Sequence, residues 1–415
     1  MLSAETIAIV KSTVPVLEAH GETLTRHFYK RMFSHNPEVK PFFNQAHQRA
    51  GLQQQALAGA ICAYAANIDN LGALGPAVEL IAQKHVSLQI KPEQYPIVGE
   101  NLLASIKEVL GDGATDEVIN AWAEAYGLLA DVLIGREAEI YDGIASEPGG
   151  WTDFKPFRIT RKEEESDVIT SFYLEPVDGK ALPVFKPGQY ITLRVPTPEG
   201  STTMRNYSLS DRPGKRWFRI SVKREDPKGP DAPEGYVSTL LHREIEVGDE
   251  IEVAAPCGEF YLHPDLDADR PLVLLAGGVG ITPLFSILAD ALQTTPDREI
   301  LLVHGTLNED LQAFKPVIEQ LAEKHPNFRR HYCYTEPAKD DRTRAAHAST
   351  GLVDEAVLNR LLPAGNAEYY FCGPRPFMVS VYGQLRTRGV PAENLHFEFF
   401  GPRGALEEEA VAKAA

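Results

Sequence analysis

The sequence has little cysteine, and what it has is not clustered. Its four cysteines, Cys62, Cys257, Cys333 and Cys372, lie far apart in the 415-residue chain and form no C-x-x-C pair. This spacing argues against a zinc site or a disulfide framework and favours reduced thiols, as in a cytosolic protein.

The chain also lacks a long unbroken apolar run and a run of basic residues. Its most apolar stretch, PLVLLAGGVGITPLF, is interrupted by glycines and a proline and is too short to span a bilayer. The N-terminus carries Glu5 and lacks the basic flank and apolar core of a signal peptide. The net charge of −17 argues against nucleic acid and anionic membrane as main partners. We therefore expect a soluble, cytoplasmic protein without stable membrane insertion.

The spacing of the apolar residues changes along the chain, and a length of 415 residues predicts two or three domains. Up to residue 148, apolar residues recur at helical spacing, for example Val118, Trp122, Tyr126, Leu129 and Leu133. The turn-rich segment SEPGGW then reads as a linker. We expect an all-α domain over residues 1–148.

After the linker the apolar spacing falls to two, as in YITLRV and WFRISV, which predicts a small antiparallel β-barrel over residues 149–265. Beyond it, the continuous apolar runs LVLLA, EILLVHG, EYYFCGP and LHFEFFG alternate with helix-like stretches. This pattern indicates a parallel sheet covered on both faces. We expect an α/β domain over residues 266–415 and thus a multidomain fold.

One histidine occupies a position in an apolar helical stripe where the pattern predicts an aliphatic side chain. Val78, Ile81 and His85 fall on one helix face. A lone histidine in such a place is more often a core residue with a local hydrogen bond. However, Tyr95 and Glu137 are able to reach the same imidazole, and a metal-ligating histidine normally donates its other N–H to such an acceptor. The residues alone leave both interpretations open.

Two polar residues near the N-terminus raise a similar question. Tyr29 and Gln53 lie among apolar residues, and Gln53 shares a helix face with Leu57. For Tyr29, the alternative to a functional pocket is a capped tyrosine in the core. For Gln53, the alternative is a position on a solvated helix face.

The segment AGGVGITP, 276–283, follows a predicted strand and opens a predicted helix. Its glycines allow close approach of a phosphate, and the helix N-terminus supplies N–H donors. Pro283 stands where the last glycine of a dinucleotide fingerprint would be, although proline is accommodated in a first helical turn. Alone, the motif supports a plain strand-turn-helix equally well.

The order of several motifs is more specific than any one of them. PGQY, RNYSLS, PCGEF, AGGVGITP and FCGP occur in the order typical of the ferredoxin-NADP reductase superfamily, over about residues 151–402. The first 148 residues resemble a bacterial globin, above all in NPEVKPFFNQ, QKHVSLQIKPEQY and REAEIYD. The whole chain resembles the flavohaemoglobins, the nitric oxide dioxygenase family.

For the helical domain, this resemblance implies a haem b whose iron is bound by His85. It also implies catalytic roles for Tyr29, Tyr95 and Glu137. Further residues implied at the haem are Phe43, Gln53, Leu57 and Lys84.

For the other two domains, the resemblance implies that Arg205 meets the FAD pyrophosphate, Tyr207 packs on the flavin and Ser208 bonds near its reactive nitrogen. Other residues implied at the flavin are Gln189, Tyr190, Asn206, Glu398, Phe399, Phe400, Gly401 and Pro402. Those implied at the nicotinamide nucleotide are Gly277, Gly278, Val279, Gly280, Ile281, Thr282, Pro283, Cys372, Gly373 and Pro374.

The implied activity is conversion of nitric oxide and dioxygen to nitrate, with electrons from NAD(P)H through FAD, by a monomer that needs no protein partner. The alternatives are a haem-based oxygen or nitric oxide binding or sensing protein, an NAD(P)H oxidase or hydroperoxide reductase, and a plain reductase whose helical domain docks a partner. The segment LLVHGTLNED has no acidic residue directly at its strand end to accept a ribose hydroxyl of NADH. It also has no arginine cluster that would clearly bind the 2′-phosphate of NADPH. Both NADH and NADPH therefore remain open.

Overall fold

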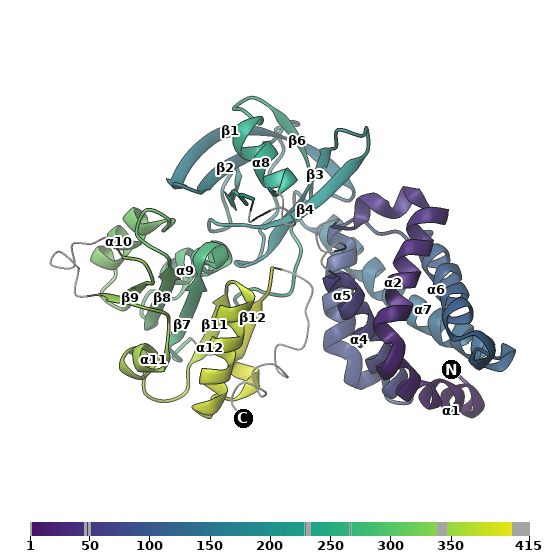
Figure 1. Ribbon diagram of the computed structural model, residues 1–415. Coiled ribbons are helices and arrows are strands. Elements are labelled where there is room, and N and C mark those ends of the chain that lie inside the picture. The colour runs from purple at the N-terminus through teal and green to yellow at the C-terminus, as the bar shows by residue number, and fades with distance from the viewer. Residues whose placement is uncertain are drawn as a thin grey trace.

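The computed structural model describes residues 2–44, 48, 51–227, 229, 234–264, 266, 268–337 and 347–400. Two residues expected at the flavin, Gly401 and Pro402, lie outside the described residues. The described chain forms a helical part, a β part and an α/β part, in that order, as Figure 1 shows. This order confirms the predicted fold class.

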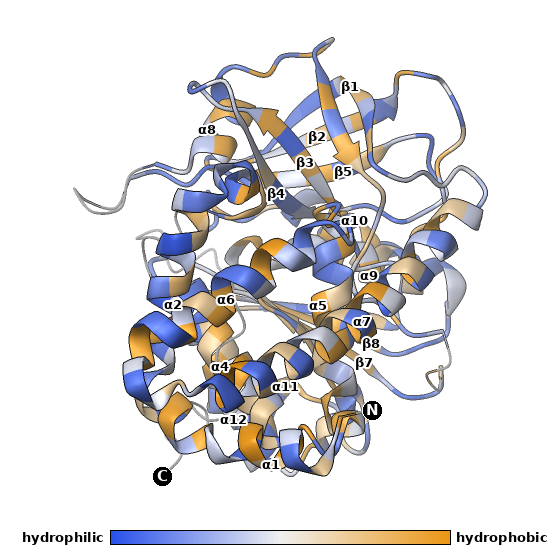
Figure 2. Ribbon diagram, turned by 90° about the vertical axis from the view of Figure 1, so that its right-hand side faces the viewer, coloured by the Kyte–Doolittle hydropathy of each residue, from blue (hydrophilic) through white to orange (hydrophobic). Residues whose placement is uncertain are grey.

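The N-terminal part is helical throughout. Its elements are α1 (Ala4–Ser12), α2 (Val14–His35), η1 (Pro37–Phe42), α4 (Leu52–Ala66), η2 (Leu71–Leu74), α5 (Gly75–Ser87), α6 (Gln94–Leu110), η3 (Gly111–Gly113) and α7 (Asp116–Ser146). The helix starts carry local signals: Ser3 caps α1 by accepting from the Thr6 N–H, and Thr115 caps α7 by accepting from the Val118 N–H. Figure 2 shows hydrophilic and hydrophobic residues on different sides of these helices.

The buried apolar residues described for the helical domain fall into three clusters, one of which also includes Cys257 of the barrel domain. Of the other two, the larger cluster contains Phe28, Tyr29 and Trp122, and the smaller one contains Tyr95 and Leu133. These two clusters pack against partly buried Tyr126 and Leu129.

Helix α7 is long and apolar enough to cross a bilayer by length and composition. However, α1, α5 and α6 pack against it within the helical domain. The buried residues of α7 that these contacts cover include Trp122, Leu133 and Ile140.

The second part is a six-stranded antiparallel sheet in the order β4-β3-β6-β1-β2-β5. The elements are β1 (Phe154–Ser166), β2 (Ile169–Pro176), β3 (Tyr190–Pro196), β4 (Thr202–Ser208), β5 (Phe218–Lys223), α8 (Tyr236–Arg243) and β6 (Glu250–Ala254). A bridge between Leu209 and Ile220 joins the two outer strands and closes the sheet into a barrel. One end of β4, which carries the RNYS motif, lies next to the helical domain (Figure 1).

The third part is a parallel sheet in the order β10-β9-β8-β7-β11-β12. Its elements are β7 (Leu272–Gly277), η4 (Gly278–Gly280), α9 (Ile281–Thr294), β8 (Ile300–Thr306), α10 (Lys315–Lys324), β9 (Phe328–Tyr334), β10 (Ala348–Thr350), α11 (Glu355–Leu361), β11 (Glu368–Cys372), α12 (Arg375–Thr387), η6 (Ala392–Asn394) and β12 (Leu395–Glu398). Helices α9 and α10 cover one face, and α11 and α12 cover the other. Strand β7 is buried along its whole length, as the continuous apolar run predicts.

Candidate active site

Three side chains from three helices meet at the end of α5. His85 lies in the last turn of α5, Tyr95 in the first turn of α6 and Glu137 in the middle of α7. The His85 Nδ1 atom lies 2.7 Å from Glu137 Oε1 and 3.0 Å from the Tyr95 hydroxyl. The Tyr95 hydroxyl donates to the same carboxylate oxygen at 2.5 Å. The structure thus brings together the three residues that the sequence singled out.

The arrangement defines where the protons lie. Burial, and then the hydrogen bond to Glu137, raises the pKa of Tyr95, so the phenol stays protonated and donates. The Glu137 side chain is only 3% exposed and accepts from both Tyr95 and the His85 Nδ1–H. An imidazole that donates from Nδ1 in this way would present a lone pair at Nε2, as a metal ligand must.

The protein around His85 fits a haem. Leu74, Val78 and Ile81, which share its helix face, are only half-buried by other side chains. Among the described residues, no hydrogen bond reaches His85 Nε2, so this atom is available to ligate iron.

Tyr29 lies on α2 in the larger apolar cluster. It is 8% exposed, and burial raises the pKa of its phenol, a shift that a hydrogen bond from Gln48 opposes. Its ring contacts the Phe43 ring with centroids 5.6 Å apart. Tyr29 therefore keeps its O–H donor at any working pH.

A residue that the sequence analysis missed joins this group. The Gln48 Nε2 group donates to Gln53 Oε1 at 2.7 Å, and Gln48 Oε1 accepts from Gln54 at 2.8 Å. Gln48 thus links Tyr29 to Gln53, while Leu57 packs against the same apolar cluster. No sequence signal identified it, because it stands in a polar segment without periodicity.

The RNYS motif lies on β4 at the side of the barrel that faces the helical domain. The Arg205 guanidinium bonds to the Met204 carbonyl at 2.6 Å and to Asn44 Oδ1 at 3.2 Å. Within the described part of the chain, no carboxylate forms an ion pair with it, and burial lowers the pKa of Arg205. A half-buried guanidinium held by neutral groups suits a phosphate.

The other predicted flavin residues lie on the neighbouring strands. Tyr190 on β3 pairs with Ser208 on β4, and Tyr207 is half-buried beside them. Asn206 donates to Ser87 of α5 at 3.3 Å. The Gln189 amide is engaged by backbone, since its Oε1 accepts from the Lys186 N–H and its Nε2 donates to the Gly258 carbonyl.

The N-terminus of α8 also lies near this motif, and the sequence analysis did not single it out. Ser238 Oγ accepts from the Glu225 N–H, and Glu225 lies within electrostatic reach of Tyr207. Thr239, one residue further, has a buried hydroxyl that makes no hydrogen bond to any described group. Helix N-termini of this kind suit a pyrophosphate. The sequence contained a signal for this helix start: Gly235, and then the pair Ser238 and Thr239 before two leucines.

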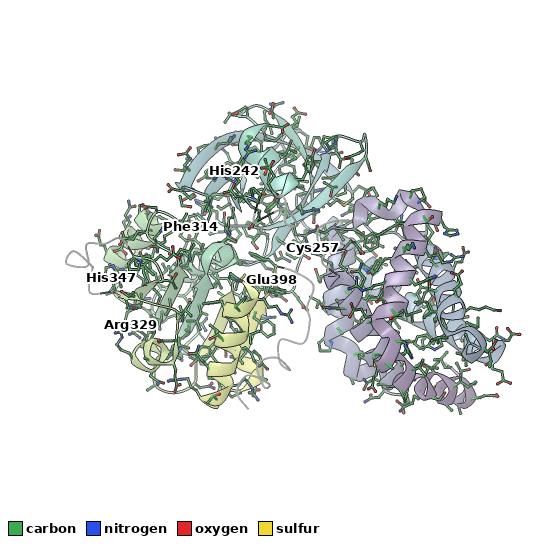
Figure 3. The ribbon with its side chains drawn as sticks, in the orientation of Figure 1. His242, Cys257, Phe314, Arg329, His347 and Glu398 are labelled. Carbon is green, nitrogen blue, oxygen red and sulfur yellow. The ribbon has the colours of Figure 1, made fainter. Side chains whose placement is uncertain are left out.

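The end of α5 that carries His85 contacts the barrel directly. The Lys84 ammonium lies 5.6 Å from the centre of the Tyr190 ring, and the Gln83 Oε1 atom accepts from the Gly258 N–H at 3.0 Å. Glu398, at the end of β12, lies within electrostatic reach of both Lys84 and Tyr190. Figure 3 shows Cys257 and Glu398 in the middle of the molecule, where the three parts meet.

Two further residues predicted at the flavin follow Glu398. Phe399 packs against the apolar cluster that includes α12, and its ring lies 5.9 Å from the Arg375 guanidinium. Phe400 is 45% exposed.

The glycine loop after β7 is held by backbone contacts. A Cβ added at Gly280 would lie 2.2 Å from the Cys372 carbonyl oxygen, and one at Gly373 would lie 2.6 Å from the Phe377 ring. Gly277 is equally confined by Phe377. By contrast, Gly278 has a positive φ of 53° and open space around it, which suits an approaching phosphate.

The remaining predicted nucleotide residues frame this loop. Thr282 Oγ1 bonds back to the Val279 carbonyl, and Ile281 and Pro283 are buried in the first turn of α9. Cys372 is fully buried at the end of β11, and Pro374 caps α12. Two strand ends and two helix starts therefore converge at the carboxyl edge of the sheet, where such folds bind nucleotides.

Three family models cover most of the chain. They are described as Globin, matching residues 26–133, as Oxidoreductase FAD-binding domain, matching residues 156–261, and as Oxidoreductase NAD-binding domain, matching residues 274–382. Together with the fold, they define a haem oxidoreductase with its own flavin and nucleotide domains.

Comparison with individual proteins narrows this class. A flavohemoprotein from Rhodopirellula baltica is 50% identical over 98% of this chain and 99% of its own length. One from Halalkalibacterium halodurans is 50% identical over 98% of both chains. The chain therefore belongs to the flavohaemoprotein family, whose cofactors are haem, FAD and a nicotinamide nucleotide, as the resemblance implied.

Two solved structures are also similar. A flavohemoglobin from Malassezia yamatoensis with bound FAD and heme has a TM-score of 0.83 at 26% identity, covering 96% of this chain and all of that one. The FAD/NAD-binding domain of a nitric oxide dioxygenase from Vibrio cholerae has a TM-score of 0.53 at 31% identity, covering 60% of this chain and all of that one.

Proposed function

We propose that this protein is a nitric oxide dioxygenase. It converts nitric oxide and dioxygen to nitrate, and one NAD(P)H supplies the two electrons needed for two molecules of each gas. The observation that carries this proposal is the position of the His85–Tyr95–Glu137 group. It stands at the end of the helix that contacts the flavin barrel directly.

The cofactors supply the redox chemistry: bound FAD accepts a hydride and releases single electrons, and bound haem supplies the iron at which the gases react. The protein supplies position and charge. His85 Nε2 would hold the iron, and Glu137 would make the imidazole a stronger donor by accepting its Nδ1–H. Tyr95 shares that carboxylate and fixes its orientation.

In the larger apolar cluster of the helical domain, Tyr29 would donate its O–H to gas bound at the haem iron. Gln53 and Gln48 add amide groups to the same pocket, while Phe43 and Leu57 exclude water from it. Donors fixed in an apolar pocket favour negative charge that develops on dioxygen during the reaction.

In the reductase half, Arg205 would bind the FAD pyrophosphate, Tyr207 would pack against the flavin, and Ser208 would hydrogen-bond near its reactive nitrogen. Gln189, Tyr190 and Asn206 complete the barrel side of the site. Glu398, Phe399 and Phe400 cover the ring from the C-terminal strand. Gly401 and Pro402, which the resemblance also implies at the flavin, lie outside the described residues.

The glycine loop and the segment that follows β11 bind the nicotinamide nucleotide. Residues 277–283 form one wall, and Cys372, Gly373 and Pro374 form the other. Lys84 lies beside the Tyr190 ring, next to His85 in the chain, and its charge would tune the redox potential of a bound haem.

The bounds of the helices and strands support the predicted domain limits. Helices end at Ser146 and the first strand begins at Phe154, while β7 begins at Leu272, consistent with domains at 1–148, 149–265 and 266–415. One chain holds the nucleotide, flavin and haem sites, so the activity needs no partner protein, and we propose a cytoplasmic monomer.

Nitric oxide consumption tests this function. Protein purified with haem and FAD should remove nitric oxide under air and form nitrate in equal amount, but only when NAD(P)H is present. Gas binding without turnover would instead indicate a sensor or carrier. Oxidation of NAD(P)H that is indifferent to nitric oxide would indicate an oxidase.

A further inference from the structure

A buried histidine in the nucleotide domain has no role in the account so far. His304 stands in the apolar strand β8, beside Ala276 of β7, and its side chain is fully buried. Residues two and four positions before it, Leu302 and Ile300, belong to the cluster beneath α9. Because side chains alternate along a strand, His304 lies on that same face, below the start of α9.

The ring makes one hydrogen bond, and it goes to the glycine loop. The His304 Nε2 atom lies 2.9 Å from the Gly278 carbonyl oxygen, which also accepts from the Ile281 N–H. Its other nitrogen, Nδ1, is buried and makes no hydrogen bond to a described residue. Burial lowers the pKa of His304 to about 4, so the ring is neutral and its single N–H must sit on Nε2.

This bond determines how the loop faces outward. In a trans peptide, the C=O and the following N–H point in opposite directions. With the Gly278 carbonyl drawn inward to a buried ring, the Val279 N–H is directed away from the interior. Gly278 and Val279 are also half-exposed, whereas the flanking Gly277 and Gly280 are buried.

We propose that His304 is a positioning residue for the nucleotide: it fixes the Gly278–Val279 peptide so that the Val279 N–H meets the NAD(P)H pyrophosphate. This rests on the proposed function in one respect, that the loop binds the nucleotide. A buried imidazole with one unpaired nitrogen costs stability relative to an aliphatic residue. The histidine is kept despite this loss of stability because its hydrogen bond orients the loop.

The test measures the NADH concentration that gives half-maximal flavin reduction, without air, in protein carrying both cofactors. His304→Leu removes the donor, and the concentration should rise about three- to tenfold, the cost of one hydrogen bond. The maximal rate should change less than about twofold, because the hydride donor and flavin are untouched. NADPH replaces NADH if the wild type prefers it.

Two conservative variants separate positioning from packing. His304→Gln places an amide N–H near the position of Nε2 and should restore tight binding. His304→Asn places its amide near Nδ1 and should not. This contrast decides the question even if His304→Leu does not fold. Equal half-maximal concentrations for wild type, Gln and Asn would overturn the proposal.

A matched control is His331→Gln. His331 is also buried in this sheet, on β9, but bonds to Ser349 and not to the loop. Its half-maximal NADH concentration should equal that of the wild type. If NADH does not reduce the flavin of the wild-type protein, that result would contradict the proposed function. An unchanged concentration in His304→Leu would contradict only the inference drawn here.

Discussion

The pocket around His85 and the loop around Gly278 are built from different parts of the chain. The pocket is made of side chains: an imidazole, a phenol and a carboxylate from three helices share hydrogen bonds. The loop is made of backbone: its conformation is fixed by what a missing Cβ allows and by bonds to a peptide carbonyl. Each construction suits its ligand, since iron needs one specific donor atom and a pyrophosphate needs several N–H groups.

The difference predicts how each site fails. Removing a side chain from the pocket should abolish or weaken one chemical interaction and leave the fold. Adding a single methyl group to the loop should instead displace two chain segments together. The substitutions below test this contrast.

His85→Ala should have the largest effect. With the imidazole gone, the helical domain has no iron ligand on this side, so haem binding and nitric oxide turnover should be lost. The reductase half should remain intact, and NAD(P)H should still reduce the flavin. The visible spectrum would show flavin without the haem band.

The exposed residue His20 provides the control, because His20→Ala should keep both the haem band and turnover. Full haem occupancy and undiminished turnover in His85→Ala would contradict the assignment of the pocket.

Glu137→Gln should have the next largest effect. An amide replaces the carboxylate with little change of shape, so the imidazole loses an anionic acceptor. Loss of such a partner typically lowers activity 10- to 100-fold. Nitric oxide consumption at saturating NAD(P)H measures it, with haem content checked by absorbance.

Glu139→Gln is the matched control, because this carboxylate, two residues away on α7, pairs with Arg136 at the surface. Its turnover should equal that of the wild type. Equal activity in Glu137→Gln would mean that the carboxylate only stabilises the fold.

Gly280→Ala tests the backbone-built site. The added Cβ would lie 2.2 Å from the Cys372 carbonyl oxygen, so the loop or the end of β11 must move. Overpacking of this kind costs about 1–3 kcal/mol of stability. The displaced N–H groups should also weaken NAD(P)H binding by about tenfold or more, measured by flavin reduction.

Gly127→Ala gives the comparison, since its Cβ would meet nothing within 4 Å and a helix favours alanine. That variant should be as stable as the wild type or slightly more so. Unchanged nucleotide binding in Gly280→Ala would remove the loop from the nucleotide site.

The architecture could be predicted from the sequence because each part has its own apolar period. Spacings of three and four gave helices up to Ser146, alternation gave the barrel, and continuous runs such as LVLLA gave buried parallel strands. The arrangement of the parts could not be predicted in this way. The bond from the Gly258 N–H to Gln83 joins positions 175 residues apart, and no local pattern specifies it.

The residues of the candidate site also differ in whether a local sequence pattern identified them. His85 was visible because a polar ring interrupts an apolar stripe, and Tyr95 and Glu137 were visible as polar groups within its reach. Their catalytic roles followed from the resemblance. Gln48 was not visible, since its polar segment has no period and only the fold brings it to Tyr29. His304 gave a signal, a histidine inside LLVHG, but its meaning depended on the neighbouring strand.

Tyr29→Phe should have the smallest effect of the series, because it removes one hydroxyl and keeps the ring packed against Phe43. Dioxygen should dissociate about three- to tenfold faster from the reduced protein, the cost of one hydrogen bond. Stopped-flow displacement of dioxygen by carbon monoxide measures the rate. Tyr64→Phe is the control, since Tyr64 is equally buried in this domain but bonds to the Ala125 carbonyl. An off-rate that is the same in both variants and the wild type would leave Gln48 and Gln53 as the groups that hold the gas.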